Sequence, residues 1–306
     1  ANRIEQDRLR EQHARKLSQP LVPLSRARAH GLRFTWSDAD LPVPSFVGRR
    51  VVEEIPLDEL ARYIDWTFFF TAWELKGRYP QILEHPRYGE AARDLYAQAR
   101  ALLDRIVKEK LLTARAVYGF WPANADGDDI VLYETAVDRT PIARFPMLRQ
   151  QQQKSDDAPF QCLADLVAPI SSGRLDHVGA FAVTAGIGAD VLVREFEQEH
   201  DDYRAIATKA LADRLAEAAA EWLHQRARRE WGYGAAENLS NEELIAERYR
   251  GIRPAFGYPA CPYHTEKDTL FRLLDAQAAG IHLTASFAMS PAASVSGIYL
   301  SHPDAR

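Results

Sequence analysis

The stretch ARAVYGFWPANADGDDIVLYE, residues 114–134, is the clearest guide to how this chain folds. Its two ends, 114–121 and 129–134, are rich in the β-branched and aromatic residues that strands favour. The residues between them, 123–127, include Asn, Asp and Gly, which are typical of tight turns. The stretch therefore predicts a β-hairpin.

The segments around this hairpin show both helical and extended patterns. Helical spacing of apolar residues recurs in five segments: 57–75, 89–110, 190–230, 241–249 and 265–278. We expect the longest of these to be broken near His200. Extended patterns recur over 178–184, 283–289 and 294–300. Helices that flank several hairpin-like strands favour an α+β domain with a mostly antiparallel sheet over a doubly wound parallel sheet.

The composition is that of an ordinary globular protein. The chain has 306 residues, of which 46% are hydrophobic, and its net charge is −5. This charge gives no general attraction to nucleic acid or to an anionic membrane, and no apolar run reaches membrane-spanning length. The two cysteines, Cys162 and Cys261, lie far apart in a long chain, which predicts free thiols in a reducing compartment. We expect a cytoplasmic protein.

Residues 1–50 differ from the rest by an excess of basic side chains. Prolines at positions 20, 23, 42 and 44 interrupt any long helix, so we expect a short helix followed by an irregular arm. Two interpretations stay open: a basic linker that docks on a neighbouring domain, and a solvated connector. Because the chain lacks an initiator Met and stops at Arg306 just after an alternating apolar run, we expect a fragment of a longer polypeptide.

Several familiar site signals are weak. Gly186 and Gly188 follow an apolar strand, but position 191 is Val instead of the third glycine of a dinucleotide-binding turn, which favours a tight strand–helix turn. No His or Cys pair has metal-ligand spacing, so we predict no metal site. Cys261 and His264 lie three residues apart in a proline-rich loop without an orienting acid, which argues against a catalytic pair.

The loop RPAFGYPACPYHTEK, residues 253–267, carries the strongest chemical signal. Prolines fix its backbone, and Gly257 allows a backbone to approach a ligand closely. Tyr258 offers an aromatic face with a polar tip. An Arg253 guanidinium held on such a rigid loop suits a carboxylate, since its planar fork can donate two parallel hydrogen bonds. The loop therefore predicts a site for an amino-acid-like or anionic small ligand.

The sequence around this loop closely resembles a known family. Residues 237–267, ENLSNEELIAERYRGIRPAFGYPACPYHTEK, resemble the C-terminal activation domain of cobalamin-dependent methionine synthase. Further matches are YIDWTFF (63–69), FWPAN (120–124), GDD (127–129), SFAMSPAASVSG (286–297) and SHPD (301–304). The resemblance covers nearly the whole chain beyond the basic arm.

This resemblance implies an architecture. It predicts a single C-shaped S-adenosylmethionine-binding domain over residues 51–306, with a mostly antiparallel twisted sheet flanked by helices. Residues 1–50 would be the basic linker that follows a cobalamin domain absent from this chain. The family continues beyond the position of Arg306 with an aromatic residue that helps to cover the ligand. We therefore expect a truncated C-terminus and a weaker affinity for S-adenosylmethionine than in the intact enzyme.

The resemblance also implies a function. In this family the module binds S-adenosylmethionine over the corrin when the cobalamin has been oxidised to cob(II)alamin. A reduced flavodoxin or a related flavoprotein supplies an electron, and the methyl group of S-adenosylmethionine restores the methylated cofactor. The full enzyme methylates homocysteine to methionine, and its folate and homocysteine sites and its zinc lie in domains absent here. We expect no catalytic residue in this chain, because the module positions groups while the cofactor supplies the chemistry.

Matching residues carry the expected roles. Arg253 would hold the ligand carboxylate, and Asp65 would accept hydrogen bonds from the α-ammonium group. The adenosyl pocket would be shaped by Ala255, Tyr258, Pro259 and Ala260. Residues matching the corrin-facing side are Glu217, Glu247 and His264. One departure from the family is Phe256, where another proline is common, so the rigidity of the loop can differ.

Three functions compete at this point. The first is the reactivation module, acting as a monomer on the cobalamin domain of the same polypeptide. The second is a free-standing S-adenosylmethionine-dependent methyltransferase, which requires a base or metal near the methyl group that the sequence does not offer. The third is a protein-docking module that uses the aromatic residues 66–73, and it leaves the Arg253 loop unexplained.

Overall fold

The computed structural model describes residues 20–154 and 156–305, together with Arg3, Glu5, Gln6, Arg8 and Arg10. The short helix predicted at the N-terminus lies mostly outside these residues. The centre of the fold is an antiparallel sheet in the order β4-β3-β2-β5-β8, with β1 also paired to β2. Its strands are β1 (Gly48–Ile55), β2 (Thr113–Asp126), β3 (Asp129–Tyr133), β4 (Pro141–Pro146), β5 (Asp176–Ile187) and β8 (Ser294–Tyr299). The predicted α+β class with an antiparallel sheet is confirmed.

The predicted hairpin is the β2–β3 pair. Asp126 lies opposite Asp129, so Gly127 and Asp128 form the turn, and β2 continues through the residues that were predicted to turn. Gly127 has a φ of 66°, which a glycine adopts without steric cost. β2 also pairs with β5 over most of its length, from Thr113 opposite Ile187 to Ala123 opposite Asp176.

The sheet is covered on both faces, and this explains its continuously apolar strands. Alternate residues of β5 belong to two different hydrophobic clusters: Phe181 and Val183 face one cluster, and Ala180 and Ala182 face the other. A strand buried on both faces has no polar side, so its sequence does not alternate. All residues from Asp176 to Gly186 are buried.

Helices cover the two faces unequally. The helices are α2 (Leu24–Ala29), α3 (Leu57–Leu60), α4 (Trp66–Thr71), α5 (Gly89–Glu109), α6 (Ala189–Gln198), α7 (Asp202–Trp231), α8 (Asn241–Ile245) and α9 (Glu266–Leu274). Residues of α3 to α7 join the larger cluster, and α9 joins the smaller one. The predicted break near His200 is confirmed: His200 has a φ of 58°, and Asp201 caps the start of α7 by accepting a hydrogen bond from the Arg204 amide.

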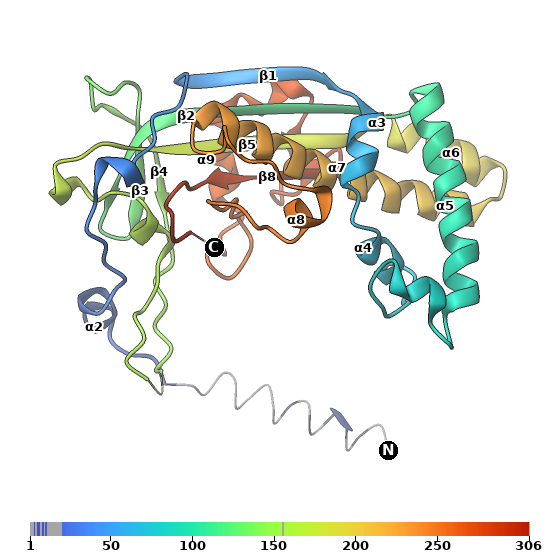
Figure 1. Ribbon diagram of the computed structural model, residues 1–306, viewed down its shortest axis with the longest axis horizontal. Helices are drawn as coiled ribbons and strands as arrows, with labels where there is room; N and C mark the ends of the chain where they lie inside the picture. Colours follow the sequence, from blue (N-terminus) through green and yellow to red (C-terminus); the bar gives the residue numbers. More distant parts are fainter. Residues whose placement is uncertain are drawn as a thin grey trace.

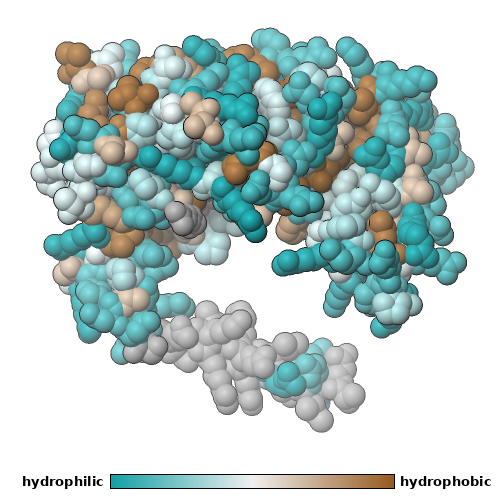
Figure 2. Space-filling view, viewed as in Figure 1, coloured by the Kyte–Doolittle hydropathy of each residue, from teal (hydrophilic) through white to brown (hydrophobic). Residues whose placement is uncertain are grey.

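The domain is C-shaped, as the resemblance implies. In Figure 1 the sheet forms the back of the C, with α4 and α5 descending at one end and α2 with its neighbouring loops at the other. The space-filling view in Figure 2 shows a concavity beneath the sheet between these two parts. The chain segment with α8 and the residues near the C-terminus lie beneath the sheet, between these two parts (Figure 1).

Some predicted boundaries are wrong. The predicted helix over 57–75 is interrupted, because Asp65 leaves the helical conformation and caps α4 through the Thr67 amide. The predicted strand over 283–289 is only a short pair, β6 (His282–Leu283) with β7 (Met289–Ser290), joined by a turn. Strands β1 and β4 were not predicted.

The N-terminal arm, defined here as residues 20–47, lies against the domain. Its backbone bonds to the segment 151–153 through Val22, and the Arg28 guanidinium donates to Asp128 at 2.8 Å. Farther along, Pro42 accepts a hydrogen bond from the indole of Trp231. The residues that follow enter β1 at Gly48, so the expected boundary between residues 50 and 51 falls inside a strand.

The Gly186–Gly188 segment is a tight strand–helix turn. Gly188 precedes α6 with a φ of 93°, and a Cβ at this position would clash with the carbonyl oxygen of Leu111. This close approach to a neighbouring backbone explains the glycine without a nucleotide.

Candidate functional site

The Arg253 loop is held on the edge of the sheet. Ile252 and Leu300 exchange two backbone hydrogen bonds of 3.0 Å, and the Ile298 amide donates to the Pro254 carbonyl at 3.0 Å. The contact is close because position 297 is glycine, whose hypothetical Cβ would clash with that same carbonyl oxygen. These bonds fix the backbone of Arg253 against β8.

The next residues form a tight turn. The Gly257 amide donates to the Cys261 carbonyl, and the Cys261 amide donates to the Tyr258 carbonyl, both at 2.9 Å. The exposed tip of this turn consists of Tyr258, Pro259 and Ala260, while Ala255 is half-buried. Phe256, the departure from the family pattern, is buried and stacks on Phe145 with ring centroids 5.4 Å apart. The phenylalanine therefore anchors the loop by packing.

Gly257 provides the first testable prediction. Its φ is 105°, and a Cβ would meet the imidazole of His264. Gly257→Ala should lower the free energy of unfolding by about 1–2 kcal/mol, because alanine is strained at positive φ. It should also shift the loop that carries Arg253. The control Gly127→Ala has a φ of 66° with open space around it, so it should lower stability without affecting the loop. Denaturant unfolding and titration with S-adenosylmethionine test both variants. Equal affinities of the two variants for S-adenosylmethionine would contradict the expected shift of the Arg253 loop.

Arg253 lies at the centre of a charged cluster. Its Nη1 is 2.8 Å from Glu221 Oε2 and donates to the hydroxyl of Tyr249, and its Nη2 is 3.5 Å from Glu247 Oε1. The Glu221 side chain is 6% exposed, whereas that of Glu247 is 65% exposed. Glu221 comes from α7, and Tyr249 and Glu247 follow α8, so three parts of the fold meet at one guanidinium.

Further buried side chains pack against this cluster. The Arg228 guanidinium is fully buried, lies 3.7 Å from the ring centroid of Tyr249, and pairs with Glu237 at 3.0 Å. His224 stacks on Tyr299 with centroids 4.9 Å apart. Buried charges and rings that contact each other in this way restrict the rotamers of the residues above them.

Several buried polar atoms beside Arg253 have no partner among the described residues. They are Glu221 Oε1, His224 Nε2 and the Tyr299 hydroxyl. Buried polar atoms are nearly always hydrogen-bonded, to protein or to ordered water. Such a group of unsatisfied atoms around one guanidinium marks a place where water or a polar ligand binds.

Burial dominates the electrostatics of the cluster. It raises the pKa of the Glu221 carboxyl, although Arg253 and Arg228 counteract part of this effect. It lowers the pKa of His224 well below the usual value, so the imidazole is neutral near pH 7. Burial is the largest single influence on Arg253 and lowers its pKa, but Glu221, Tyr249 and Glu247 together outweigh it, so the net pKa is raised and the guanidinium stays charged. The Arg253 guanidinium is therefore charged near pH 7, and it faces the carboxylates of Glu221 and Glu247.

The residues just before Asp65 contact α7 and α8, the helix that carries Glu221 and the helix that precedes Glu247. Its Oδ1 accepts from the Thr67 amide at 2.8 Å, and no hydrogen bond to Oδ2 is found within residues 20–154 and 156–305. Two contacts link the residues just before it to the site. The Tyr63 hydroxyl donates to Gln225 on α7 at 3.1 Å, and Asn241 on α8 donates to the Arg62 carbonyl at 2.8 Å.

Of the other predicted residues, one contacts Arg253 and two lie exposed at the surface. Glu247 joins Arg253, while Glu217 is exposed on α7 one turn before Glu221, and His264 is exposed beside Gly257. Sequence reasoning missed the roles of Glu221 and Tyr249. The polar residues Glu221, Gln225 and Arg228 recur at helical spacing along α7, but only the structure shows that this face of the helix is buried.

The aromatic segment 66–73 is mainly core. Trp66, Phe69 and Phe70 are buried, and only Phe68 among the aromatic residues of α4 is exposed. This arrangement removes most of the surface that a docking module based on these residues would need. The predicted free thiols are confirmed, since Cys162 and Cys261 are both unpaired and buried.

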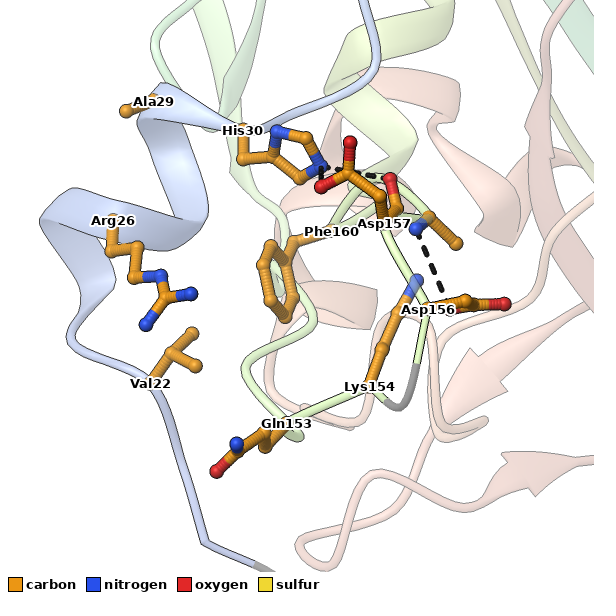
Figure 3. A pocket seen from close by; sticks show the side chains of 10 residues that line it. Val22, Arg26, Ala29, His30, Gln153, Lys154, Asp156, Asp157 and Phe160 are labelled. Carbon is orange, nitrogen blue, oxygen red and sulfur yellow. Dashed lines mark hydrogen bonds and ion pairs between the residues drawn. The ribbon is translucent and has the colours of Figure 1, made fainter.

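A separate cavity of about 290 Å³ lies between α2 and the segment 153–160 (Figure 3). Its lining includes Arg26, His30, Lys154 and Asp157, and His30 bonds to Asp157. None of these residues was predicted to bind a ligand. Within the described part of the chain, no cluster of three or more His, Cys, Asp or Glu side chains is suited to a metal ion, and no helix is long and apolar enough to cross a membrane.

Comparison with known proteins identifies the family of this chain. The family model described as the vitamin B12 dependent methionine synthase activation domain matches residues 56–306. The chain is also similar to the protein in a crystal structure of the MetH reactivation domain bound to AdoHcy, with 50% sequence identity and a TM-score of 0.90. This similarity covers 94% of the present chain and 88% of the other. The chain therefore belongs to the family of vitamin B12-dependent methionine synthase activation domains.

Proposed function

We propose that this chain binds S-adenosylmethionine at Arg253 and presents its methyl group to a cobalamin domain of the same polypeptide. The outcome would be the reductive remethylation of cob(II)alamin and the reactivation of methionine synthase. The observation that carries this proposal is the Arg253 guanidinium, which is held on a rigid loop among buried polar atoms that have no hydrogen-bond partner in the described part of the chain. The similar reactivation domain that binds AdoHcy supports the ligand class, because AdoHcy shares the adenosyl and amino-acid parts of S-adenosylmethionine.

The residues present fit this ligand. Its amino-acid end is zwitterionic, so it needs a cation for the carboxylate and an anion for the ammonium group. Arg253 supplies the first, and the Asp65 carboxylate, with one oxygen left by its capping hydrogen bond, supplies the second. The exposed turn of Tyr258, Pro259 and Ala260, together with the half-buried Ala255, would border the adenosyl group.

The contribution of the protein would be positioning. When bound, the cobalamin supplies the nucleophile, and the chain holds the methyl donor in a fixed orientation toward it. The concavity in Figure 2 offers a place where a neighbouring domain could approach the site. Glu217 and His264 are both exposed and remain candidates for the corrin-facing side. We further propose that the protein is a cytoplasmic monomer and that flavodoxin or a related flavoprotein supplies the electron that reduces the cobalamin.

A methyl-transfer assay tests this function. The chain would be mixed with labelled S-adenosylmethionine, a separate cobalamin domain of methionine synthase in the cob(II)alamin state, and reduced flavodoxin. We expect label on the cobalamin only when all components are present. Transfer to a small acceptor without the cobalamin domain would instead support a free-standing methyltransferase. No transfer under either condition would contradict both functions.

A substitution of Asp65 should weaken ligand binding less than a substitution of Arg253. Asp65→Asn should weaken S-adenosylmethionine binding by about 1–2 kcal/mol, less than a substitution of Arg253, because asparagine keeps a hydrogen-bond acceptor but loses the charge. Asparagine is also a good helix cap, so α4 should remain intact. Calorimetric titration together with thermal denaturation separates the two effects. An unchanged affinity would remove Asp65 from the site.

A further inference from the structure

The two terminal nitrogens of Arg253 have different surroundings. Nη1 makes all the buried contacts, with Glu221 Oε2 at 2.8 Å, the Tyr249 hydroxyl, and His224 Nδ1 at 3.4 Å. Within residues 20–154 and 156–305, the one ion pair of Nη2 is with Glu247 Oε1 at 3.5 Å, and Nε makes no hydrogen bond. A guanidinium presents Nη2 and Nε side by side, and this edge can bind a carboxylate through two parallel hydrogen bonds.

The carboxylates of Glu221 and Glu247 hold Arg253 with unequal strength. Glu221 is almost completely buried and close, whereas Glu247 is mostly exposed and lies beyond normal hydrogen-bond distance. The backbone of Glu247 also has a φ of 52°, an unfavourable conformation for a residue other than glycine. Since exposed ion pairs contribute little to stability, breaking the contact between Glu247 and Arg253 requires little free energy.

We propose that Glu247 is a placeholder carboxylate, which covers the Nη2–Nε edge of Arg253 until the ligand carboxylate displaces it. In the same arrangement Tyr249 is a positioning residue that holds Nη1 from behind. Arg253 is then neutralised both before and after binding, so the guanidinium keeps one orientation. This inference rests on the proposed function, and it gives Glu247 a different role from the corrin-facing one implied by the family.

The placeholder lowers the apparent affinity of the ligand. A site that is partly occupied by an internal competitor binds in proportion to the fraction that is open. Because an exposed ion pair is weak, removing the charge of Glu247 should tighten binding by only about two- to fivefold. Glutamine at this position keeps the size of the side chain and reduces only its attraction to Arg253.

Tyr249 should act in the opposite direction. Its hydroxyl contacts both Arg253 and Glu221 Oε2, and its ring packs on Arg228 and against His224. Tyr249→Phe keeps the ring contacts and the charge of the site but removes the hydroxyl. The guanidinium then has more freedom, so we expect about fivefold weaker binding.

Calorimetric titration of the whole chain tests both roles with two ligands. S-adenosylmethionine carries the carboxylate, and decarboxylated S-adenosylmethionine keeps the ammonium and sulfonium groups but lacks it. With the first ligand, Glu247→Gln should bind two- to fivefold tighter and Tyr249→Phe about fivefold weaker than wild type. With the second ligand, both variants should match wild type. Glu242→Gln, on the exposed surface of α8, is the matched control and should change neither affinity.

Other outcomes have defined meanings. Weaker binding of both ligands by Glu247→Gln would show that Glu247 attracts the cationic groups, and it would overturn the placeholder role. An equal loss for both ligands in Tyr249→Phe would reduce Tyr249 to a general structural residue. If wild type bound neither ligand, the proposed function itself would fail. Binding by wild type with no change in either variant would overturn only the present inference.

Discussion

Arg253→Ala should weaken the binding of S-adenosylmethionine by about 2–4 kcal/mol, which is about 30- to 1,000-fold in the dissociation constant. The substitution removes the guanidinium that is proposed to hold the ligand carboxylate with a planar pair of donors. It also leaves the buried carboxylate of Glu221 without its 2.8 Å counter-ion. Calorimetric titration measures the first effect, and thermal denaturation of the same variant measures the second.

Arg253→Lys separates these two effects. Lysine keeps a positive charge beside Glu221, but its ammonium group cannot donate two parallel hydrogen bonds from one plane. We expect a stable variant that binds the ligand about tenfold more weakly than wild type. Wild-type affinity in Arg253→Ala would contradict the assignment of the carboxylate to this residue.

Arg149→Ala should lower the free energy of unfolding by about 3–5 kcal/mol, because it leaves two buried carboxylates without their shared partner. The Arg149 side chain is 5% exposed, and it donates to Asp128 at 2.7 Å and to both oxygens of Asp165 at 2.6 and 2.9 Å. Asp128 also accepts from Arg28, so this network connects the N-terminal arm to the domain. Denaturant unfolding measures the loss.

The matched control for this variant is Arg144→Ala. Arg144 also bridges two aspartates, Asp126 at 2.8 Å and Asp129 at 2.7 Å, but its side chain is 47% exposed. Exposed pairs contribute about 0–1 kcal/mol each, so we expect a small change in stability. Equal losses in the two variants would show that burial does not decide the strength of these networks.

The helices were predictable because their signal is local. The apolar spacing in 89–110 marks α5 almost to its ends, and the break near His200 follows from a loss of that spacing. β1 was missed because its sequence, GRRVVEEI, mixes charged and apolar residues and has partly exposed side chains. Its paired residues in β2 lie 59 to 72 positions farther along the chain, from Ile55 opposite Ala114 to Gly48 opposite Phe120, and such nonlocal pairing leaves little trace in a short window.

The position of Arg253 in the site was predictable from the sequence. Arg253 stands out through its proline and glycine neighbours and through the family motif. The identity of its buried partner was not predictable, because Glu217 and Glu221 lie one turn apart on the same helix. Only the packing of α7 shows that Glu221 points inward while Glu217 faces solvent. The contact between Glu247 and Arg253 depends on the turn after α8, where Glu247 has a positive φ. Glutamate is not a residue type that predicts this conformation.

A crystal structure of the chain with S-adenosylmethionine is the most direct test of this account. We expect the ligand carboxylate on the Nη2–Nε edge of Arg253, the ammonium group near Asp65, and Glu247 turned away into solvent. Glu221 and Tyr249 should keep their contacts with Nη1. A ligand bound elsewhere, or one whose carboxylate does not contact Arg253, would contradict the central claim.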